Sequence, residues 1–325
     1  MSTHLRWGFL GTGGIARAVA GDFAIAGIPI RAVGARELDS ANAFGEEFDI
    51  PNRHHGYEAL VNDPEVDIIY VTTIHPMHHQ HALLALNAGK HVLLEKPFTI
   101  NAREAQEIAD LARAKNLFVM EAMWSRFLPS MDAIFEVIRS GQLGEIQGVM
   151  ADHSQYLPKV PRMTEIELGG GALLDLGIYP VSFAHRILGK PKTITARATL
   201  TSKKVDSMTS IIFEYDGGAQ AALTTCFFAA GPVTATVIGT EARLEIAYPF
   251  YNQTSFQVIN KLGEVIDSYD HKIAGIGRQY QALHAEKCIH EGLIQSPVMS
   301  LVESVEIMEV MDAIRAQIGV RYPTE

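Results

Sequence analysis

The chain has few cysteines, no long apolar run and no excess of basic residues. Only two cysteines occur in 325 residues, Cys226 and Cys288, which is too few for a disulfide framework. No apolar run approaches the roughly 20 residues that a membrane span needs, and residues 1–6 lack the apolar segment of a signal peptide. We therefore expect a soluble, cytoplasmic protein that has no membrane partner.

The charge balance is acidic and the composition is that of an ordered protein. Lys and Arg number 27 against 37 Asp and Glu, a formal net charge of −10. This charge repels phosphate backbones, so nucleic acid is not an expected partner. Apolar residues make up 47% of the chain, and no tract has low complexity. Because single cores stop growing below this chain length, we expect two domains.

A glycine-rich segment follows an apolar stretch close to the N-terminus. Gly11 permits a tight turn, Gly13 lets the backbone approach a pyrophosphate, and Ala16 lets a new helix pack on the strand before it. The phosphate would lie at the N-terminus of that helix. The pattern is G-x-G-x-x-A, and it predicts a dinucleotide site formed by Gly11, Thr12, Gly13, Gly14, Ile15 and Ala16.

The residue that follows the second predicted strand bears on the choice of cofactor. An NAD enzyme places an Asp or Glu there to bind the ribose 2′-hydroxyl. This chain has Arg36, whose planar guanidinium suits a 2′-phosphate, followed by Glu37. The pattern favours NADP over NAD. The alternative is that Arg36 is a solvated loop residue and that Glu37 binds the ribose.

Two further segments carry residues suited to acid–base chemistry. Glu95, Lys96 and a proline follow an apolar strand, and three glycines lead into Asp175 and Tyr179. A tyrosine has an ordinary pKa near 10, so it can accept a proton at neutral pH only if a nearby cation such as Lys96 favours the phenolate. Asp175 and Tyr179 are spaced i, i+4 on a predicted helix and share one face. In the alternative interpretation, Lys96 is a surface lysine, Asp175 is a first-turn residue favoured by the helix dipole, and Tyr179 is a core aromatic.

The order of the elements predicts the fold class. Strands and helices alternate up to about residue 120, which predicts an α/β domain with a parallel sheet at residues 1–122. Residues 123–325 should form an α+β domain with a largely antiparallel, open sheet. The expected strands lie at 6–10, 28–33, 67–71, 91–94, 117–121, 146–156, 193–201, 210–215, 219–227 and 233–238, and residues 256–266 should form a pair of strands folded about residues 261–263. The first expected helix begins at about residue 15. The other expected helices lie at 39–48, 57–62, 76–88, 102–115, 172–188, 278–290 and 300–318.

A group of histidines invites a metal assignment, which the spacing does not support. His75 and His78 are spaced i, i+3, with His79 and His81 close by. Zinc sites need three or four ligands in defined geometry, and no cysteine and no H-E-x-x-H pattern is near. We expect no metal, and a cofactor entrance here instead. Trp124 either lines the substrate pocket or is buried at a domain junction.

Together these motifs resemble the Gfo/Idh/MocA oxidoreductases over essentially the whole chain. Residues 73–78 and 120–124 are most similar to the branch that contains dimeric dihydrodiol dehydrogenase and NADP-linked xylose dehydrogenase. The resemblance implies a Rossmann domain, NADP, a catalytic role for Lys96 and an acid/base role for Tyr179, and it matches Asp175 to a substrate-site aspartate. It also implies that the open sheet face forms a dimer. We expect Thr73, His75, His78, Glu95 and Lys96 beside the cofactor, and Trp124, Asp175 and Tyr179 beside the substrate.

The hypothesis that follows is an NADP-dependent oxidoreductase acting on a CH–OH or C=O carbon of a sugar, polyol or cyclic diol. The protein would hold that carbon against the nicotinamide. The alternative is a nucleotide-sensing regulator of the same fold without catalysis, because the family includes such a protein. Retention of Lys96, Asp175 and Tyr179 argues against the alternative. The strands between Thr193 and Phe228 form a sheet that helices should cover on one face, and the apolar residues left open predict a symmetric dimer.

Overall fold

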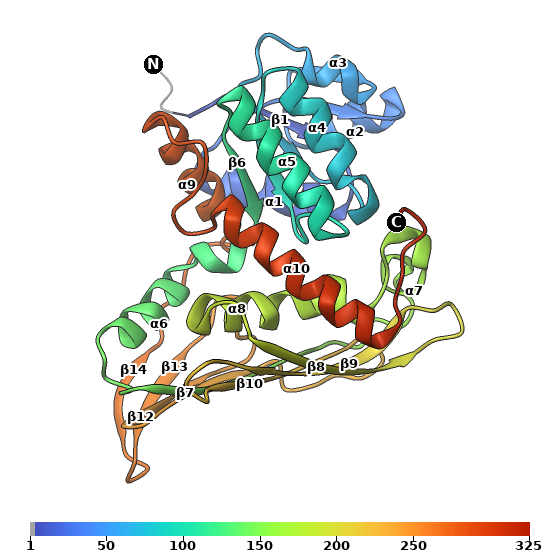
Figure 1. Cartoon of the computed structure of the whole chain (residues 1–325). Helices are drawn as coiled ribbons and strands as arrows, with labels where there is room; N and C mark the ends of the chain where they lie inside the picture. The colour runs from blue at the N-terminus through green and yellow to red at the C-terminus, as the bar shows by residue number, and fades with distance from the viewer. Residues whose placement is uncertain (1–3) are drawn as a thin grey trace. The chain divides into compact units, whose positions relative to one another are not determined.

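The computed structural model describes residues 4–325 (Figure 1). The chain divides into two compact units. The first unit takes in the segment 274–305, far along the chain from its other parts, which no local sequence pattern indicated. The predicted boundary between residues 122 and 123 stays a prediction. The first unit contains residues 4–99, 103–127 and 274–305, and the second contains residues 100–102, 128–273 and 306–325.

The first unit is built on a six-stranded sheet in which every pairing is parallel. Its strand order is β3-β2-β1-β4-β5-β6. This confirms the predicted parallel α/β sheet. The strands are β1 (Trp7–Leu10), β2 (Ile30–Ala35), β3 (Asn52–His55), β4 (Ile68–Val71), β5 (His91–Glu95) and β6 (Val119–Ala122). The helices are α1 (Gly14–Ala26), α2 (Leu38–Glu47), α3 (Tyr57–Val61), α4 (His78–Asn87), α5 (Ala102–Lys115) and α9 (Gln279–His290), with 3₁₀ turns at His75–Met77 and Trp124–Phe127.

The central strands are apolar because both of their faces are buried. All four residues of β1 and all four of β4 are buried. Phe9 of β1 meets Phe23 and Tyr70 edge-to-face, with ring centroids 5.4 and 5.3 Å apart. Such aromatic pairs contribute about 0.5–1.5 kcal/mol each beyond the area they bury. The packing holds the C-terminal ends of the strands, and the loops that follow them, in register.

Three local predictions in this unit were wrong in their details. The second strand begins at Ile30 rather than at residue 28, because Gly27 ends α1 in the left-handed conformation and Ile28 closes the turn on the carbonyl of Phe23. Helix α2 begins at Leu38 rather than at residue 39, with Glu37 at the cap position and no side-chain cap bond. Strand β3 was not predicted, because its sequence NRHH has no apolar residue.

The second unit is built on an eight-stranded, mostly antiparallel sheet, as predicted. Its order is β14-β13-β12-β11-β7-β10-β9-β8, and only β7 and β10 pair in parallel. The sequence patterns missed β12 and α6. The strands are β7 (Ile146–Ser154), β8 (Thr193–Leu200), β9 (Asp206–Glu214), β10 (Gln220–Cys226), β11 (Ala235–Gly239), β12 (Ala242–Ile246), β13 (Phe256–Asn260) and β14 (Val265–Tyr269). The helices are α6 (Pro129–Arg139), α7 (Pro161–Thr164), α8 (Ile178–Leu188) and, from residue 306 onward, α10 (Leu301–Ile318).

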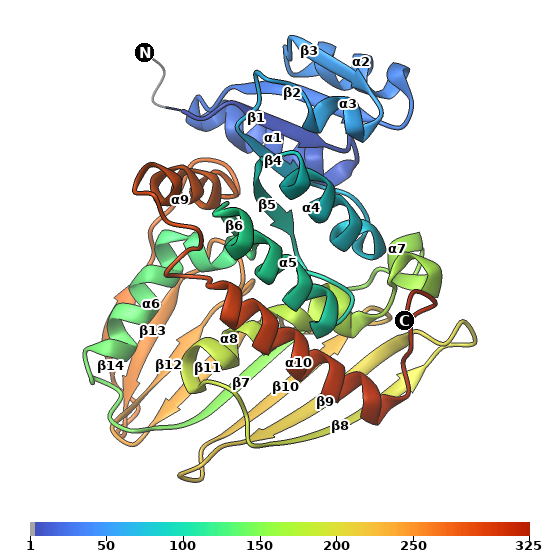
Figure 2. The same ribbon diagram turned by 45° about the horizontal axis from the view of Figure 1, so that its top comes forward.

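Helices cover one face of this sheet. Figures 1 and 2 show α6, α8 and the second part of α10 on the same side of the strands. Along β9 the side chains alternate accordingly: Ile211 and Phe213 are buried, whereas Met208 and Ile212 are 42% and 40% exposed. In register, Ile212 pairs with Ala222, which in turn pairs with Met150. Among the described residues of this unit, no helix lies over that second face.

The segment that leads into α8 differs from a plain α-helix. Residues Leu173–Gly177 form a π-helical turn, and α8 follows directly at Ile178. The sequence predicts one continuous helix over 172–188. Single π turns inside helices are rare and occur frequently at functional sites. Within residues 4–325, no helix has the length and apolar character needed to cross a membrane.

Candidate active site

The glycine-rich turn after β1 has the geometry of a phosphate site. Gly11 has φ +115° and donates its N–H to the carbonyl of Gly34 at 3.0 Å, and a Cβ at Gly11 would lie 2.8 Å from Thr72 Oγ1. Only glycine therefore fits at this position. Helix α1 begins at Gly14 without a side-chain cap, and a Cβ at Gly13 or Gly14 would meet nothing within 4 Å. The first N–H groups of α1 have no partner within the helix, so a pyrophosphate beside the glycines can accept hydrogen bonds from them.

Arg36 follows the last residue of β2 and is exposed. Tyr57 lies within reach of its charge: burial raises the pKa of the Tyr57 hydroxyl, and the guanidinium of Arg36 opposes that rise. Glu37 is also exposed and occupies the cap position of α2. Both candidates for the ribose contact therefore lie at the strand end where the sequence places them, and the choice between them stays a prediction.

The histidines near the predicted cofactor site contact the loops that follow β4 and β5. His78 is fully buried, with Nδ1 2.8 Å from the carbonyl of Pro97 and Nε2 3.0 Å from the carbonyl of Thr73. Burial lowers the pKa of His78 to about 4, so its neutral ring donates to one carbonyl at a time. Thr73 Oγ1 lies 3.0 Å from Nδ1 of His81, and the rings of His75 and His78 meet edge-on at 5.7 Å. Among residues 4–325, no group of three or more potential ligands is placed to hold a metal ion.

Glu95 is the last residue of β5, and Lys96 follows it in a turn. Glu95 is buried, its Oε1 accepts a short hydrogen bond from the Tyr70 hydroxyl, and its Oε2 accepts the backbone N–H of Lys96 at 3.2 Å. Burial raises the pKa of both Glu95 and Tyr70. Lys96 itself is partly buried, and the peptide bond from Lys96 to Pro97 is cis. These contacts fix the main chain from which the Lys96 ammonium extends.

Trp124 belongs to an ion-paired group that sequence reasoning missed. Its ring lies under the guanidinium of Arg278, at 5.1 Å from the centroid. Arg278 Nη1 lies 3.3 Å from Oδ2 of Asp22 on α1, and Asp22 also accepts the backbone N–H groups of Ile276 and Arg278. Asp22 and Arg278 are 256 positions apart in sequence, so no local spacing could have paired them.

Asp175 lies in the π-helical turn of the second unit. It is 3% exposed, and its Oδ2 lies 3.2 Å from Nη2 of Arg162, whose side chain is half exposed. An exposed guanidinium beside a buried carboxylate can neutralise the carboxylate and still reach a polar ligand. Sequence spacing gives no sign of this ion pair, which joins α7 to the π-helical turn.

Tyr179, on the first turn of α8, packs in an aromatic cluster with two residues distant in sequence. Its ring centroid lies 5.0 Å from that of His153 and 4.7 Å from that of Tyr251, and His153 stacks on Tyr251 at 4.2 Å. His153 Nδ1 donates to the carbonyl of Leu176 at 3.0 Å, and the amide nitrogen of Gln155 donates to His153 Nε2 and to the Tyr251 hydroxyl. These bonds fix the imidazole as the Nδ1–H tautomer. The cluster gives Tyr179 a rigid aromatic environment.

The predicted catalytic residues are divided between the two units. Lys96 belongs to the first unit, and Asp175 and Tyr179 belong to the second. Within the second unit, Asp175 lies in the π-helical turn and Tyr179 lies four residues later, in the first turn of α8. Their assembly with Lys96 around one substrate stays a prediction.

A glycine-bearing phosphate turn on a parallel sheet, with a separate sheet-and-helix unit, defines a two-domain dinucleotide-binding protein. Sequence comparison gives its family. Residues 5–123 match the model described as "Oxidoreductase family, NAD-binding Rossmann fold", and residues 131–245 match the GFO/IDH/MocA C-terminal domain. The chain belongs to the Gfo/Idh/MocA family of oxidoreductases, and it is an NAD(P)-dependent enzyme.

Several known proteins are similar over their full length. The chain is 38% identical to the trans-1,2-dihydrobenzene-1,2-diol dehydrogenase of Xenopus laevis over 333 residues, covering 98% of this chain and 99% of that protein. Its identity to the human protein of the same name is 34% over 334 residues, covering 99% of each. The aldose-aldose oxidoreductase of Caulobacter crescentus has a TM-score of 0.87 at 23% identity, with 97% of each chain covered. The 3-ketoreductase KijD10 of Actinomadura kijaniata, solved with NADP, has a TM-score of 0.84 at 24% identity, covering 97% of this chain and 98% of that one. At these identities the two structures show a shared fold.

Proposed function

We propose that this enzyme oxidises a CH–OH carbon of a six-membered ring that carries adjacent hydroxyls, with NADP, or reduces the corresponding ketone. A trans-dihydrodiol and a pyranose sugar share this ring and this pair of hydroxyls. The observation that carries the proposal is the start of α8, where Tyr179 packs on His153 and Tyr251 beside the ion-paired Asp175. The names of the similar proteins, a dihydrodiol dehydrogenase and an aldose-aldose oxidoreductase, support the same substrate class.

The residues of the first unit fit a dinucleotide. The uncapped start of α1 and the open space beside Gly13 and Gly14 accommodate its pyrophosphate. The exposed guanidinium of Arg36 suits a 2′-phosphate, which supports NADP rather than NAD. KijD10 was solved with NADP, in agreement with this choice. When bound, the nicotinamide supplies the acceptor or donor of the hydride.

In this proposal the protein moves the proton and holds the substrate. The Tyr179 oxygen takes the proton of the reacting hydroxyl as general base, and returns it in the reverse direction. The Lys96 ammonium stabilises the phenolate and the negative charge that develops on the substrate oxygen. Asp175 accepts a hydrogen bond from the neighbouring hydroxyl and so orients the ring. Trp124 would line the substrate pocket near the nicotinamide and limit access of water.

The test is formation of NADPH with a panel of ring diols, pyranoses and open-chain polyols. Tyr179→Phe should lower turnover on the best substrate by roughly 10²–10⁴-fold, the usual contribution of a positioned general base. Tyr248→Phe, which alters a tyrosine of the same unit that is 69% exposed, is the matched control and should keep wild-type turnover. Wild-type turnover in Tyr179→Phe, or activity on open-chain polyols alone, would contradict the proposal.

The open sheet face supports a homodimer. Met150, Met208, Ile212 and Phe228 are each 40–53% exposed there or at its border, and monomers rarely expose contiguous apolar patches larger than a few hundred Å². A second copy of the chain packed sheet against sheet would cover it with closed symmetry. A cytoplasmic location and the absence of nucleic-acid partners stay predictions from composition.

Sedimentation of a charged variant tests the dimer. Ile212→Lys puts an ammonium in the middle of the open face and should yield monomer at micromolar concentration, because an unpaired buried charge is costly. Ala114→Lys is the control: it adds the same charge at an exposed position of α5, in the first unit rather than on the open sheet face, and should leave the dimer intact. A wild-type protein that sediments as monomer would remove the claim.

A further inference from the structure

The three glycines before Asp175 form a loop held closely by the backbone of the segment around α7. Gly170 N–H donates to the carbonyl of Glu165 at 3.1 Å, and Gly171 N–H donates to the carbonyl of Met163 at 3.0 Å. A Cβ at Gly170 would lie only 2.6 Å from the carbonyl oxygen of Glu165. This loop delivers the chain into the π-helical turn, so its position determines where that turn begins.

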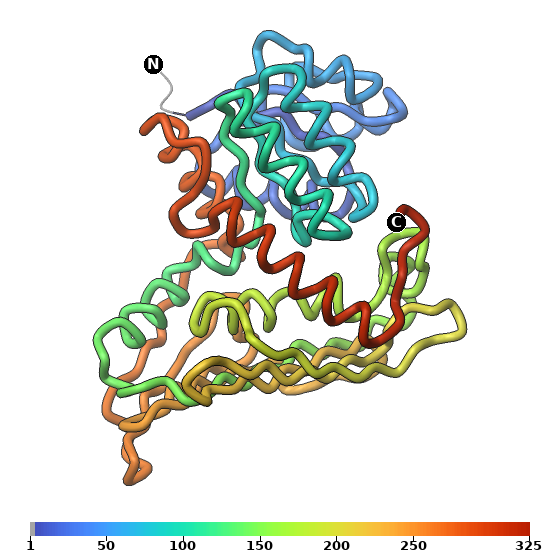
Figure 3. The backbone as a smooth tube through the Cα atoms, viewed as in Figure 1, coloured from blue at the N-terminus to red at the C-terminus, as the bar shows by residue number. Residues whose placement is uncertain are grey.

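The C-terminal segment reaches this loop from the other end of the sequence. Figure 3 shows the chain after α10 running beside the segment that contains α7. Tyr322 is 2% exposed, and its hydroxyl donates to the carbonyl of Gly170 at 2.9 Å. Burial raises the pKa of Tyr322, so the hydroxyl keeps its proton and remains a donor at any working pH.

Tyr322 is itself held by an ion-paired tail. The buried guanidinium of Arg315 lies over the Tyr322 ring at 5.1 Å and binds both carboxylate oxygens of Glu325 at 2.7 Å. Glu325 also accepts the backbone N–H of Tyr322 at 2.9 Å. Burial acts to raise the pKa of Glu325, but the hydrogen bonds from Arg315 and from the Tyr322 N–H, together with the charge of Arg315, outweigh it and the pKa is lowered. A bidentate pair of this kind fixes geometry as well as charge.

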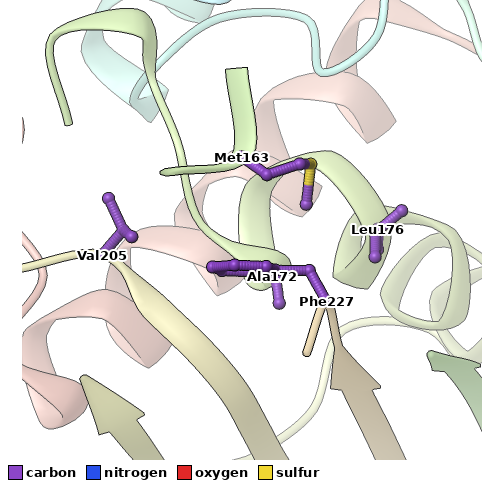
Figure 4. Packing of buried hydrophobic residues seen from close by; sticks show 5 residues of the cluster. All are labelled: Met163, Ala172, Leu176, Val205 and Phe227. Carbon is purple, nitrogen blue, oxygen red and sulfur yellow. The ribbon is translucent and has the colours of Figure 1, made fainter. Parts of the chain in front are cut away.

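A second buried group supports the same turn from the sheet. Asp206 has no exposed surface, and its Oδ2 accepts the backbone N–H of Leu173 at 2.8 Å and the hydroxyl of Thr209 at 2.7 Å. A Cβ at Gly171 would lie 2.2 Å from Asp206 Oδ1, so the glycine is required for this approach. The apolar cluster around the turn completes the support, with Met163, Ala172, Leu176, Val205 and Phe227 packed together (Figure 4).

We propose that Tyr322 is a positioning residue for the reaction: its hydroxyl fixes the Gly170 carbonyl and thereby the turn that presents Asp175 and Tyr179 to the substrate. The C-terminal segment then contributes to the geometry of the substrate site, although Tyr322 lies 152 positions from Gly170 in the sequence. The inference rests on the proposed function, because it assigns Tyr322 an effect that passes through Tyr179.

Removing only the hydroxyl oxygen of Tyr322 distinguishes its hydrogen bond to Gly170 from the packing of its ring. Tyr322→Phe keeps the buried ring but leaves the Gly170 carbonyl unpaired. A misplacement of about 1 Å can cost on the order of 10²-fold in rate, so a partly loosened loop should lower kcat by roughly 5- to 30-fold. The affinity for NADP should stay unchanged, because its glycine turn lies in the first unit. Tyr215→Phe is the matched control, since the Tyr215 hydroxyl is buried and has no hydrogen-bond partner among the described residues. It should keep wild-type kcat.

The experiment measures kcat and the Kd of NADP for Tyr322→Phe, Tyr179→Phe and the double variant. If Tyr322 acts through Tyr179, the loss in the double variant should be at least fivefold smaller than the product of the two single losses. Losses that multiply, a Tyr322→Phe variant with wild-type kcat, or a fall in NADP affinity that matches the fall in kcat would each overturn the inference. Should Tyr322→Phe fail to fold, Glu325→Gln, which loosens the tail and keeps the tyrosine, takes its place with the same expected pattern and the same refuting results. Wild-type kcat in Tyr179→Phe would overturn the proposed function itself, whereas wild-type kcat in the Tyr322 variant alone would overturn only the positioning role.

Discussion

Replacing Arg36 by Ala tests the choice of cofactor most directly. Arg36 follows β2 and is exposed, so any phosphate that it binds stays partly hydrated. A hydrogen bond to a charged group contributes about 1.5–3 kcal/mol, and exposure places this contact in the lower half of that range. We therefore expect Arg36→Ala to weaken NADP binding by roughly 10- to 30-fold.

The assay is a titration of NADP and NAD into each variant at low and high salt. NAD affinity should change little, because NAD has no 2′-phosphate. The loss of NADP affinity should shrink as salt rises, because an exposed charge pair is screened. Arg31→Ala is the matched control: it removes an exposed arginine near the other end of β2, where Arg31 pairs with Glu65, and it should leave both affinities intact.

Two results would refute the reasoning on Arg36. Equal losses of NAD and NADP affinity would indicate a collapsed loop rather than a lost phosphate contact. Tighter binding of NAD than of NADP by the wild-type protein would favour Glu37 as the ribose ligand, and the NADP assignment would fail.

The remaining predictions concern Lys96 and Glu121. Lys96→Met should lower turnover and raise the pH at which oxidation becomes efficient, because the phenolate of Tyr179 loses a stabilising charge; a pH–rate profile identical to that of the wild type would contradict this. Burial raises the pKa of Glu121 from its ordinary 4.5 to about 7, so the folded protein retains a proton there that the unfolded chain has lost. The free energy of unfolding should therefore fall as pH rises from about 4.5 to about 7. Glu121→Gln should reduce that fall, as measured by urea midpoints at pH 5 and pH 8, and an unchanged fall would show that Glu121 does not titrate in this range.

The fold was predictable where local signals were strong. Helix α5 has the predicted bounds, because its apolar face recurs at helical spacing and charged residues fill the rest of Ala102–Lys115. Strand β3 was not predictable, because NRHH carries no apolar alternation and its place depends on pairing with β2. The choice between parallel and antiparallel pairing of β7 and β10 also has no local signal, since it follows from the order in which the whole sheet assembles.

The site was predictable as a set of residue types but not as a set of contacts. The glycine turn, Lys96, Asp175 and Tyr179 stand in short motifs whose chemistry the sequence states directly. The partners of these residues come from distant segments: the Tyr251 ring packs against that of Tyr179, and the Tyr322 hydroxyl binds the loop before Asp175. Such pairs depend on tertiary packing, which the hydrophobic periodicity of the sequence does not predict.

The π-helical turn shows why an i, i+4 spacing was an incomplete guide. Leu173 is the first residue of this turn, so its N–H has no partner within the helix, and Asp206 accepts it at 2.8 Å. At the same end, the Thr225 hydroxyl donates to the carbonyl of Ala172 at 3.2 Å. A side chain that inserts into the helical ladder distorts the helix locally. The orientation of Asp175 relative to Tyr179 is therefore determined by residues of β9 and β10, so substitutions in that sheet should alter substrate turnover without touching the substrate.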